Sequence, residues 1–246
     1  MAKGTDTVII HGQPGSRARF RGVMRASLPL CAALVLCGYA IGVLLPLPAV
    51  GLVWKGLMIV VLAFALVLAT SLTSQRIDAF FKGAAGEVAA AWALARLPGG
   101  YTVFHGVDIA DAHGGIKTHD FDHVVLAPGG LVVVETKNWR GAITFDDGVV
   151  RTGGIVPSAD PVAQVAAEAE ALSSWLADRI PDKPEVTPLL CFVGDSLPAD
   201  APTELRGVAI CSDAALTDAI LSRCSKALPM PASAYERIST LLKGKV

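Results

Sequence analysis

Two long uncharged apolar tracts constrain the fold of this chain more than any other sequence feature. Residues 26–54 contain no charged side chain, and neither do residues 56–75, with Lys55 alone between them. Each tract holds about 17 to 20 strongly apolar residues, the length of helix that crosses a hydrocarbon core of roughly 30 Å. We therefore predict a transmembrane hairpin at residues 27–72. Its helices lie at about 28–45 and 56–72, and the helix-breaking run Pro46-Leu47-Pro48 joins them.

The charges that flank the tracts predict the orientation of this hairpin. Four arginines precede the first tract, and two cations follow the second: Arg17, Arg19, Arg21, Arg25, Arg76 and Lys82. Positive charge favours the cytoplasmic side of a membrane. We expect a multi-pass protein of the inner, cytoplasmic membrane with both termini in the cytoplasm and residues 1–26 as a basic tail. The alternative is a cleaved signal peptide followed by a single span.

Small residues in the first tract, among them Gly38 and Gly42, would let another helix approach closely. Such packing fits contacts within the hairpin or between two copies of the chain. A homo-oligomer is therefore one expectation that the sequence leaves open.

The part of the chain after residue 72 is about 175 residues long, enough for one domain with its own core. Apolar residues recur at helical intervals in some segments, and β-rich runs bounded by turn residues occupy others. We expect helices at 80–97, 161–176, 212–225 and 232–243, and strands at 101–109, 123–126, 131–134, 142–145, 149–152, 189–193 and 207–211. This order predicts an α/β fold, in which a mixed sheet is flanked by helices.

The turn at Pro128-Gly129 sets the register of a central hairpin. Counting outward pairs Leu126 with Leu131 and places Asp122 opposite Glu135, and paired residues of an antiparallel ladder project from the same face. Lys137 follows on that face. Two carboxylates and an ammonium within a run of valines and leucines are costly unless a cation or a substrate uses them.

This group suits the hydrolysis of a phosphodiester. Asp122 and Glu135 would be ligands of Mg²⁺ (or Mn²⁺), the carbonyl of Thr136 would complete the metal shell, and Lys137 would face the attacking water or the scissile phosphate. The alternative is structural: Asp122 and Lys137 form a salt bridge at a strand end, and Glu135 is solvated.

Two helical residues are further candidates. Glu87 lies in the first half of an alanine-rich helix and is a candidate outer metal ligand, although an anion near a helix N-terminus is also favourable in its own right. Gln164 lies one turn into the helix that Asp160 and Pro161 begin. Its amide would reach the site or a phosphate, or would simply be a polar group at the surface.

Four segments together resemble the NERD, or nuclease-related, domain, a relative of the PD-(D/E)xK restriction-endonuclease-like superfamily. The central one runs from Gly130 to Gly141 and carries Glu135-Thr136-Lys137; the others are Gly86-Glu87, Phe121-Asp122-His123-Val124-Val125 and Asp160-Pro161-Val162-Ala163-Gln164. Phe121 stands where an aliphatic residue is more usual, and Asp160 where Asn is frequent.

The resemblance covers about residues 80–180 and implies a restriction-endonuclease-like mixed sheet with a Mg²⁺ site. It matches Glu87 to the helix glutamate, Asp122 to the strand aspartate, Glu135 and Lys137 to the E-x-K pair, and Gln164 to the later helix glutamine. Residues 181–246 lie outside it, and we expect them to complete the domain with strands and helices.

The function expected from these features is a membrane-anchored, cytoplasm-facing Mg²⁺-dependent nuclease that acts on DNA or on RNA. The excess of acidic residues in the second part of the chain favours a different class of protein. From residue 72 to the end there are 15 Lys and Arg against 21 Asp and Glu, whereas nucleic-acid binders usually present a basic face. The alternative is a catalytically inactive scaffold that keeps the nuclease fold to bind nucleic acid or a protein partner.

Overall fold

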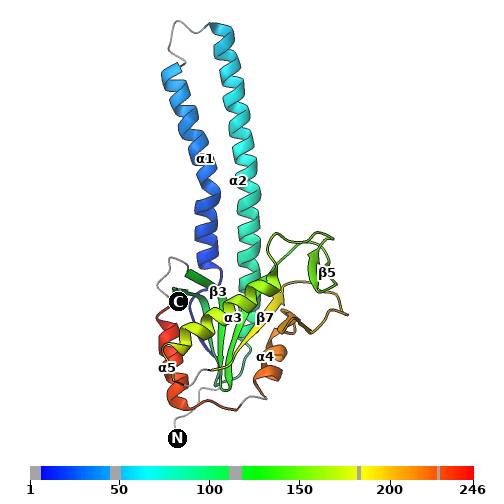
Figure 1. Cartoon of the computed structure of the whole chain (residues 1–246). Coiled ribbons are helices and arrows are strands. Elements are labelled where there is room, and N and C mark those ends of the chain that lie inside the picture. The colour runs from blue at the N-terminus through cyan, green and yellow to red at the C-terminus, as the bar shows by residue number, and fades with distance from the viewer. Residues whose placement is uncertain (1–6, 45–50, 111–117, 182–183, 226–227) are drawn as a thin grey trace. The chain divides into compact units, whose positions relative to one another are not determined.

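The computed structural model describes residues 7–44, 51–110, 118–181, 184–225 and 228–246. It divides into two compact units, one formed by Arg17–Lys82 and the other by Met1–Ser16 together with Gly83–Val246. The predicted α/β class, a mixed sheet flanked by helices and preceded by two long helices, is confirmed (Figure 1).

The unit Arg17–Lys82 consists of two antiparallel helices, α1 (Ser16–Leu44) and the first part of α2 (Leu52–Leu94). The thiol of Cys37 lies 3.9 Å from the carbonyl oxygen of Leu62. A Cβ added to Gly22 would overlap the ring of Phe80, so the two helices also pack closely near their other ends. The proline-rich connection at residues 46–48 lies outside the described residues.

Apolar side chains cover both helices and are exposed. Val35 is 71% exposed and Phe64 70% exposed, and the most apolar stretches of the two helices bury none of their residues. Both helices are long and apolar enough to cross a membrane.

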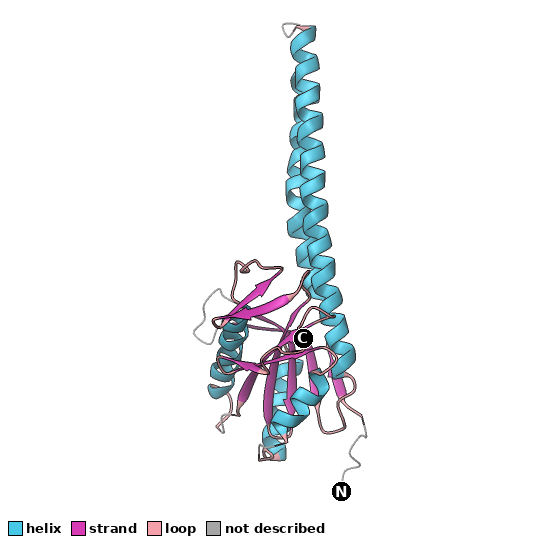
Figure 2. Ribbon diagram, turned by 90° about the vertical axis from the view of Figure 1, so that its right-hand side faces the viewer, coloured by secondary structure: helices cyan, strands magenta, loops and turns pink. Residues whose placement is uncertain are grey.

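A seven-stranded mixed sheet forms the centre of the other unit (Figure 2). Its strand order is β1-β2-β3-β4-β7-β9-β8. The antiparallel meander β2-β3-β4 continues through parallel pairs to β7 and β9, while β1 joins β2 in parallel and β8 joins β9 in antiparallel fashion. The strands are Ile9–His11 (β1), Thr102–Ala110 (β2), Thr118–Ala127 (β3), Gly130–Lys137 (β4), Val186–Phe192 (β7), Glu204–Leu205 (β8) and Val208–Ser212 (β9).

Helices cover both faces of this sheet. One face packs against α3 (Pro161–Ala177) and α5 (Ala232–Lys243), through residues such as Val124, Val133 and Leu172. The other face packs against the last turns of α2 and against α4 (Leu216–Cys224). The hairpin of β5 (Ile143–Asp146) and β6 (Val149–Thr152) forms a separate two-stranded sheet. The site described below lies on the α3 face.

Several element boundaries differ from the expected ones. Helix α2 runs without a break to Leu94, where separate helices at 56–72 and from Phe80 were expected, because neither proline nor glycine interrupts the intervening sequence. The helix expected from Ser212 begins at Leu216, since Ser212 is still paired with Phe192 in the sheet. Strand β1 was not expected, because three residues carry too little pattern to indicate a strand.

Candidate active site

Strand β4 carries an acidic and a basic residue side by side. Glu135 and Lys137 are two residues apart and therefore project from the same face of the strand. The ammonium of Lys137 donates to Glu135 Oε1 at 2.6 Å, and the two side chains are 18% and 6% exposed. An ion pair this buried requires further hydrogen bonds to offset its desolvation.

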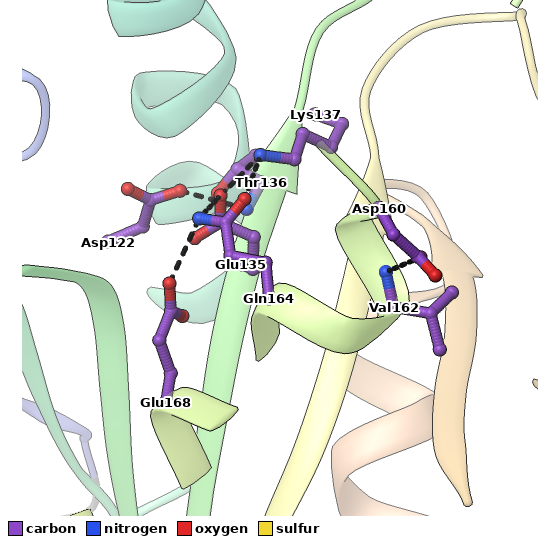
Figure 3. A network of polar contacts seen from close by, with 8 residues as sticks. All are labelled: Asp122, Glu135, Thr136, Lys137, Asp160, Val162, Gln164 and Glu168. Atoms are coloured by element: carbon purple, nitrogen blue, oxygen red, sulfur yellow. Dashed lines mark hydrogen bonds and ion pairs between the residues drawn. The ribbon is translucent and has the colours of Figure 1, made fainter. Parts of the chain in front are cut away.

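Helix α3 supplies those hydrogen bonds through Gln164. Its Oε1 accepts from Lys137 Nζ at 2.9 Å, and its Nε2 donates to Glu135 Oε1 at 2.8 Å (Figure 3). Gln164 thus completes a ring of three contacts with the carboxylate of Glu135 and the ammonium of Lys137. Of the two interpretations left open for Gln164, the structure supports contact with the site over a surface role.

The start of α3 is fixed by the cap expected from the sequence. Asp160 Oδ1 accepts from the backbone N–H groups of Val162 at 3.0 Å and Ala163 at 3.3 Å, and Pro161 is the first helical residue. Arg206 donates to the same carboxylate at 2.7 Å. This cap determines where α3 begins, and the contacts of Gln164 place its first turns at the end of β4.

Asp122 is held next to this network by the backbone of β4. The expected register is confirmed from Ala127 and Gly130 as far as the pair of His123 with Val134, where the paired ladder ends. The carboxylate of Asp122 then accepts from the backbone N–H of Thr136 at 2.9 Å, in place of a further ladder bond. Burial, followed by the negative charges of Glu135 and Glu87, raises the pKa of Asp122 well above its usual range.

Glu87 lies on α2 and has a different hydrogen-bond partner. Its Oε2 accepts from the backbone N–H of Gly15 at 2.8 Å, at the end of the N-terminal segment that contains β1. Its charge is close enough to raise the pKa of Asp122. The structure therefore places Glu87 beside the site, bound to the backbone of Gly15 and close to Asp122.

Glu168 belongs to this network and was not expected from the sequence. It lies one turn after Gln164 on α3, it is 8% exposed, and its Oε1 accepts from Gln164 Nε2 at 2.9 Å. Burial, with the charge of Glu135 as the next cause, raises the pKa of Glu168 to about 8. The available signal was its spacing: residues four apart share a helix face, and Glu168 stands among the apolar residues of α3.

A pair of histidines occupies the sheet beside Asp122. His105 on β2 and His123 on β3 are paired across the ladder, and their Nδ1 atoms are 2.8 Å apart. Such a contact requires a hydrogen on one Nδ1 and none on the other, so the two rings are not both protonated. Burial lowers the pKa of His105 to about 4 and that of His123 well below its usual value.

The carboxylates fit a hard cation that keeps much of its water shell. Among the described residues, no three His, Cys, Asp or Glu side chains are arranged as a complete metal-ligand set. Mg²⁺ does not need such a set, because it is usually held by one or two carboxylates, water and substrate phosphates. Burial, followed by the charges of Glu135 and Glu87, raises the pKa of Asp122, and a cation bound nearby would favour the charged form of this carboxyl group.

Residues 82–193 match the family model of NERD, the nuclease-related domain. All the residues predicted for the site, from Glu87 to Gln164, lie within this NERD match, as does Glu168. The matched region takes in β2 to β7 and α3, while β8, β9, α4 and α5 lie beyond it.

Two further proteins are similar to parts of the chain. An uncharacterised protein of Bacillus anthracis is 40% identical over 77 residues, which make up 30% of this chain and 35% of that protein. The chain thus matches about a third of the relative's length. A crystal structure of a Vibrio cholerae protein aligns with 92% of this chain and 58% of its own, at 11% identity and a TM-score of 0.30. A likeness that low carries no argument about the fold or the site.

Proposed function

We propose that this protein is a metal-dependent nuclease that hydrolyses phosphodiester bonds of DNA, or of RNA, at the site formed by Asp122, Glu135 and Lys137. The observation that carries the proposal is the closed network of Glu135, Lys137 and Gln164 beside the buried Asp122. The NERD match, whose family description is nuclease-related, supports the same class of reaction.

The oxygen atoms of Asp122 and Glu135 would hold Mg²⁺ or Mn²⁺ together with the carbonyl of Thr136, and Glu87 would act from outside this set. A bound divalent ion supplies charge stabilisation at the phosphate and lowers the pKa of a coordinated water. The N–H of Thr136 donates to Asp122 Oδ2 and so orients the carboxylate that would hold the ion.

Lys137 contributes a positioned N–H donor. An ammonium has three donors, and Glu135 and Gln164 accept two of them. In the part of the chain that the structure describes, the third has no acceptor and is left for the attacking water or a phosphate oxygen. Positioned donors and proton-transfer groups of this kind contribute roughly 10²- to 10⁴-fold to a rate.

Cleavage by the full chain in detergent micelles tests the proposal. The substrates are single- and double-stranded DNA and RNA, each with Mg²⁺, Mn²⁺ or EDTA. We expect metal-dependent cleavage that falls at least about 100-fold in Asp122→Asn and in Lys137→Met. The matched control, Lys243→Met in the last turn of α5, changes an exposed lysine and should cleave like the unaltered protein. Equal cleavage by all four proteins would exclude this site.

The proposal includes membrane anchoring by α1 and α2, with both termini on the cytoplasmic side. The exposed apolar surface of the two antiparallel helices supports it. Alkaline extraction of a membrane fraction should leave the protein in the lipid, and protease added to spheroplasts should spare tags at either terminus. Release by alkali, or digestion of one tag, would contradict the anchoring or the orientation.

A non-catalytic scaffold is the second candidate, and the acidic charge of residues 72–246 favours it. A scaffold would show no metal-dependent cleavage on any of the substrates. It would still bind nucleic acid or a protein partner, and binding would persist in Lys137→Met only if the ammonium is not part of the contact.

A further inference from the structure

Glu168 is a buried carboxyl group for which the proposed chemistry has no role so far. It makes one hydrogen bond that the structure describes, from Gln164 Nε2 to Oε1 at 2.9 Å. Its other oxygen, Oε2, is buried and has no partner among the described residues. A carboxyl group in such surroundings costs stability, so a reason for its presence is expected in the contact that it does make.

That contact determines which way the amide of Gln164 faces. A glutamine amide has two N–H donors on one side and a carbonyl acceptor on the other. Both donors of Gln164 are taken by carboxyl oxygens, one from Glu135 and one from Glu168, while the carbonyl accepts from Lys137. The network therefore uses every donor of the amide.

A half-turn of the amide would break all three contacts. Nε2 would then face the ammonium of Lys137, and Oε1 would face the two carboxyl groups. Glu135 by itself opposes this turn with one hydrogen bond, and Glu168 adds the second from the opposite side (Figure 3). The loss of one such bond shifts an equilibrium by up to about tenfold.

We propose that Glu168 is a positioning residue of the nuclease site: by fixing the amide of Gln164, it fixes the carbonyl that holds the Lys137 ammonium in place. This inference rests on the proposed function for its catalytic consequence, but not for its geometry. The raised pKa of Glu168 supports it, because a neutral carboxylic acid keeps an acceptor for Gln164 without adding a second negative charge beside Glu135.

The first experiment measures hydrogen exchange of the Gln164 side-chain amide and does not depend on cleavage. The chain contains only three glutamines, Gln13, Gln75 and Gln164, so ¹⁵N-glutamine labelling of the full chain in micelles gives three side-chain NH₂ signals. Loss of a signal in Gln164→Met assigns the one of interest. Hydrogen exchange of its two protons is then compared between the unaltered protein, Glu168→Ala and Glu168→Gln.

We expect exchange of the Gln164 amide to quicken about tenfold in Glu168→Ala, as the loss of one such bond implies, and to change less than about twofold in Glu168→Gln, which keeps an acceptor. Glu170→Ala, at an exposed position of the same helix, is the matched control and should leave exchange unaltered. Unchanged exchange in Glu168→Ala would overturn the positioning role, whether or not the protein is a nuclease.

The second experiment measures the kinetics of cleavage by the same variants. A positioning role predicts that kcat falls about tenfold in Glu168→Ala with KM nearly unchanged, and that Glu168→Gln restores most of it. Equal kcat values for Glu168→Ala and the unaltered protein would overturn the catalytic consequence. If the unaltered protein cleaves nothing, the proposed function fails, while amide exchange still decides whether Glu168 positions Gln164.

Discussion

Lys137 Nζ donates to Glu135 Oε1 at 2.6 Å across the two-residue spacing of a single strand. Both side chains are largely buried, and the contact directs the ammonium toward α3 rather than into solvent. Because both charged groups are buried, this ion pair affects the stability of the site as well as its chemistry.

This ion pair should show a large coupling energy. In a double-mutant cycle of Lys137→Met and Glu135→Gln, we expect a coupling of about 1–3 kcal/mol in the free energy of unfolding, because each single change leaves a buried polar partner unmatched. The measurement is denaturant unfolding followed by tryptophan fluorescence. The exposed pair of Arg151 and Asp146, 3.3 Å apart, is the matched control and should couple by less than about 1 kcal/mol. Equal coupling in both pairs would contradict the burial argument.

Acid should destabilise the protein through the histidine pair. The pKa of His105 is about 4 in the folded protein, below its ordinary value of 6.5, so the unfolded chain binds more protons between these limits. Stability contributed by the neutral ring is therefore present above pH 6.5 and is lost as the pH falls toward 4. We expect the melting midpoint of the unaltered protein to fall more steeply over this interval than that of His105→Gln. Parallel curves would show that the buried ring does not titrate as described.

Glu168 should make the opposite contribution. Its pKa is raised from 4.5 to about 8, so the folded state binds more protons than the unfolded state between these values. The stability associated with the neutral acid is present below pH 4.5 and is lost as the pH rises through 8. Glu168→Gln should therefore gain stability relative to the unaltered protein between pH 5 and pH 9, as followed by thermal unfolding. Glu170→Gln should show no such gain, and a gain there would point to a general charge effect.

Two glycines of α2 should respond in opposite directions to alanine. A Cβ added to Gly86 would lie 2.7 Å from the Cβ of Asn138, one residue after Lys137, whereas a Cβ on Gly83 would meet nothing within 4 Å. Gly83→Ala should stabilise the protein by about 0.5–1 kcal/mol through helix propensity. Gly86→Ala should destabilise it by about 1–3 kcal/mol, because the close approach of helix and strand must open. Denaturant unfolding of both variants measures these changes in the free energy of unfolding. Equal stabilisation by the two changes would mean that Gly86 and Asn138 lie farther apart than described.

Local sequence patterns were enough to predict part of the site. The Pro128-Gly129 turn predicted the pairing of Leu126 with Leu131, and alternation along β4 put Glu135 and Lys137 on one face. The Asp160-Pro161 signal predicted the start of α3. Each of these features depends on neighbours within a few residues, through turn geometry, strand period or helix capping.

The sequence by itself therefore determined the fold class, the apolar helices, the central hairpin and the start of the helix that carries Gln164. Only the tertiary structure decided that β3 leaves the ladder at Asp122, that Glu87 binds the backbone of Gly15, and that Glu168 completes the hydrogen bonds of Gln164. These contacts join segments whose relative placement depends on how helices pack on the two faces of the sheet. Spacing along the chain does not encode that placement, because it arises from the burial of apolar faces contributed by distant segments.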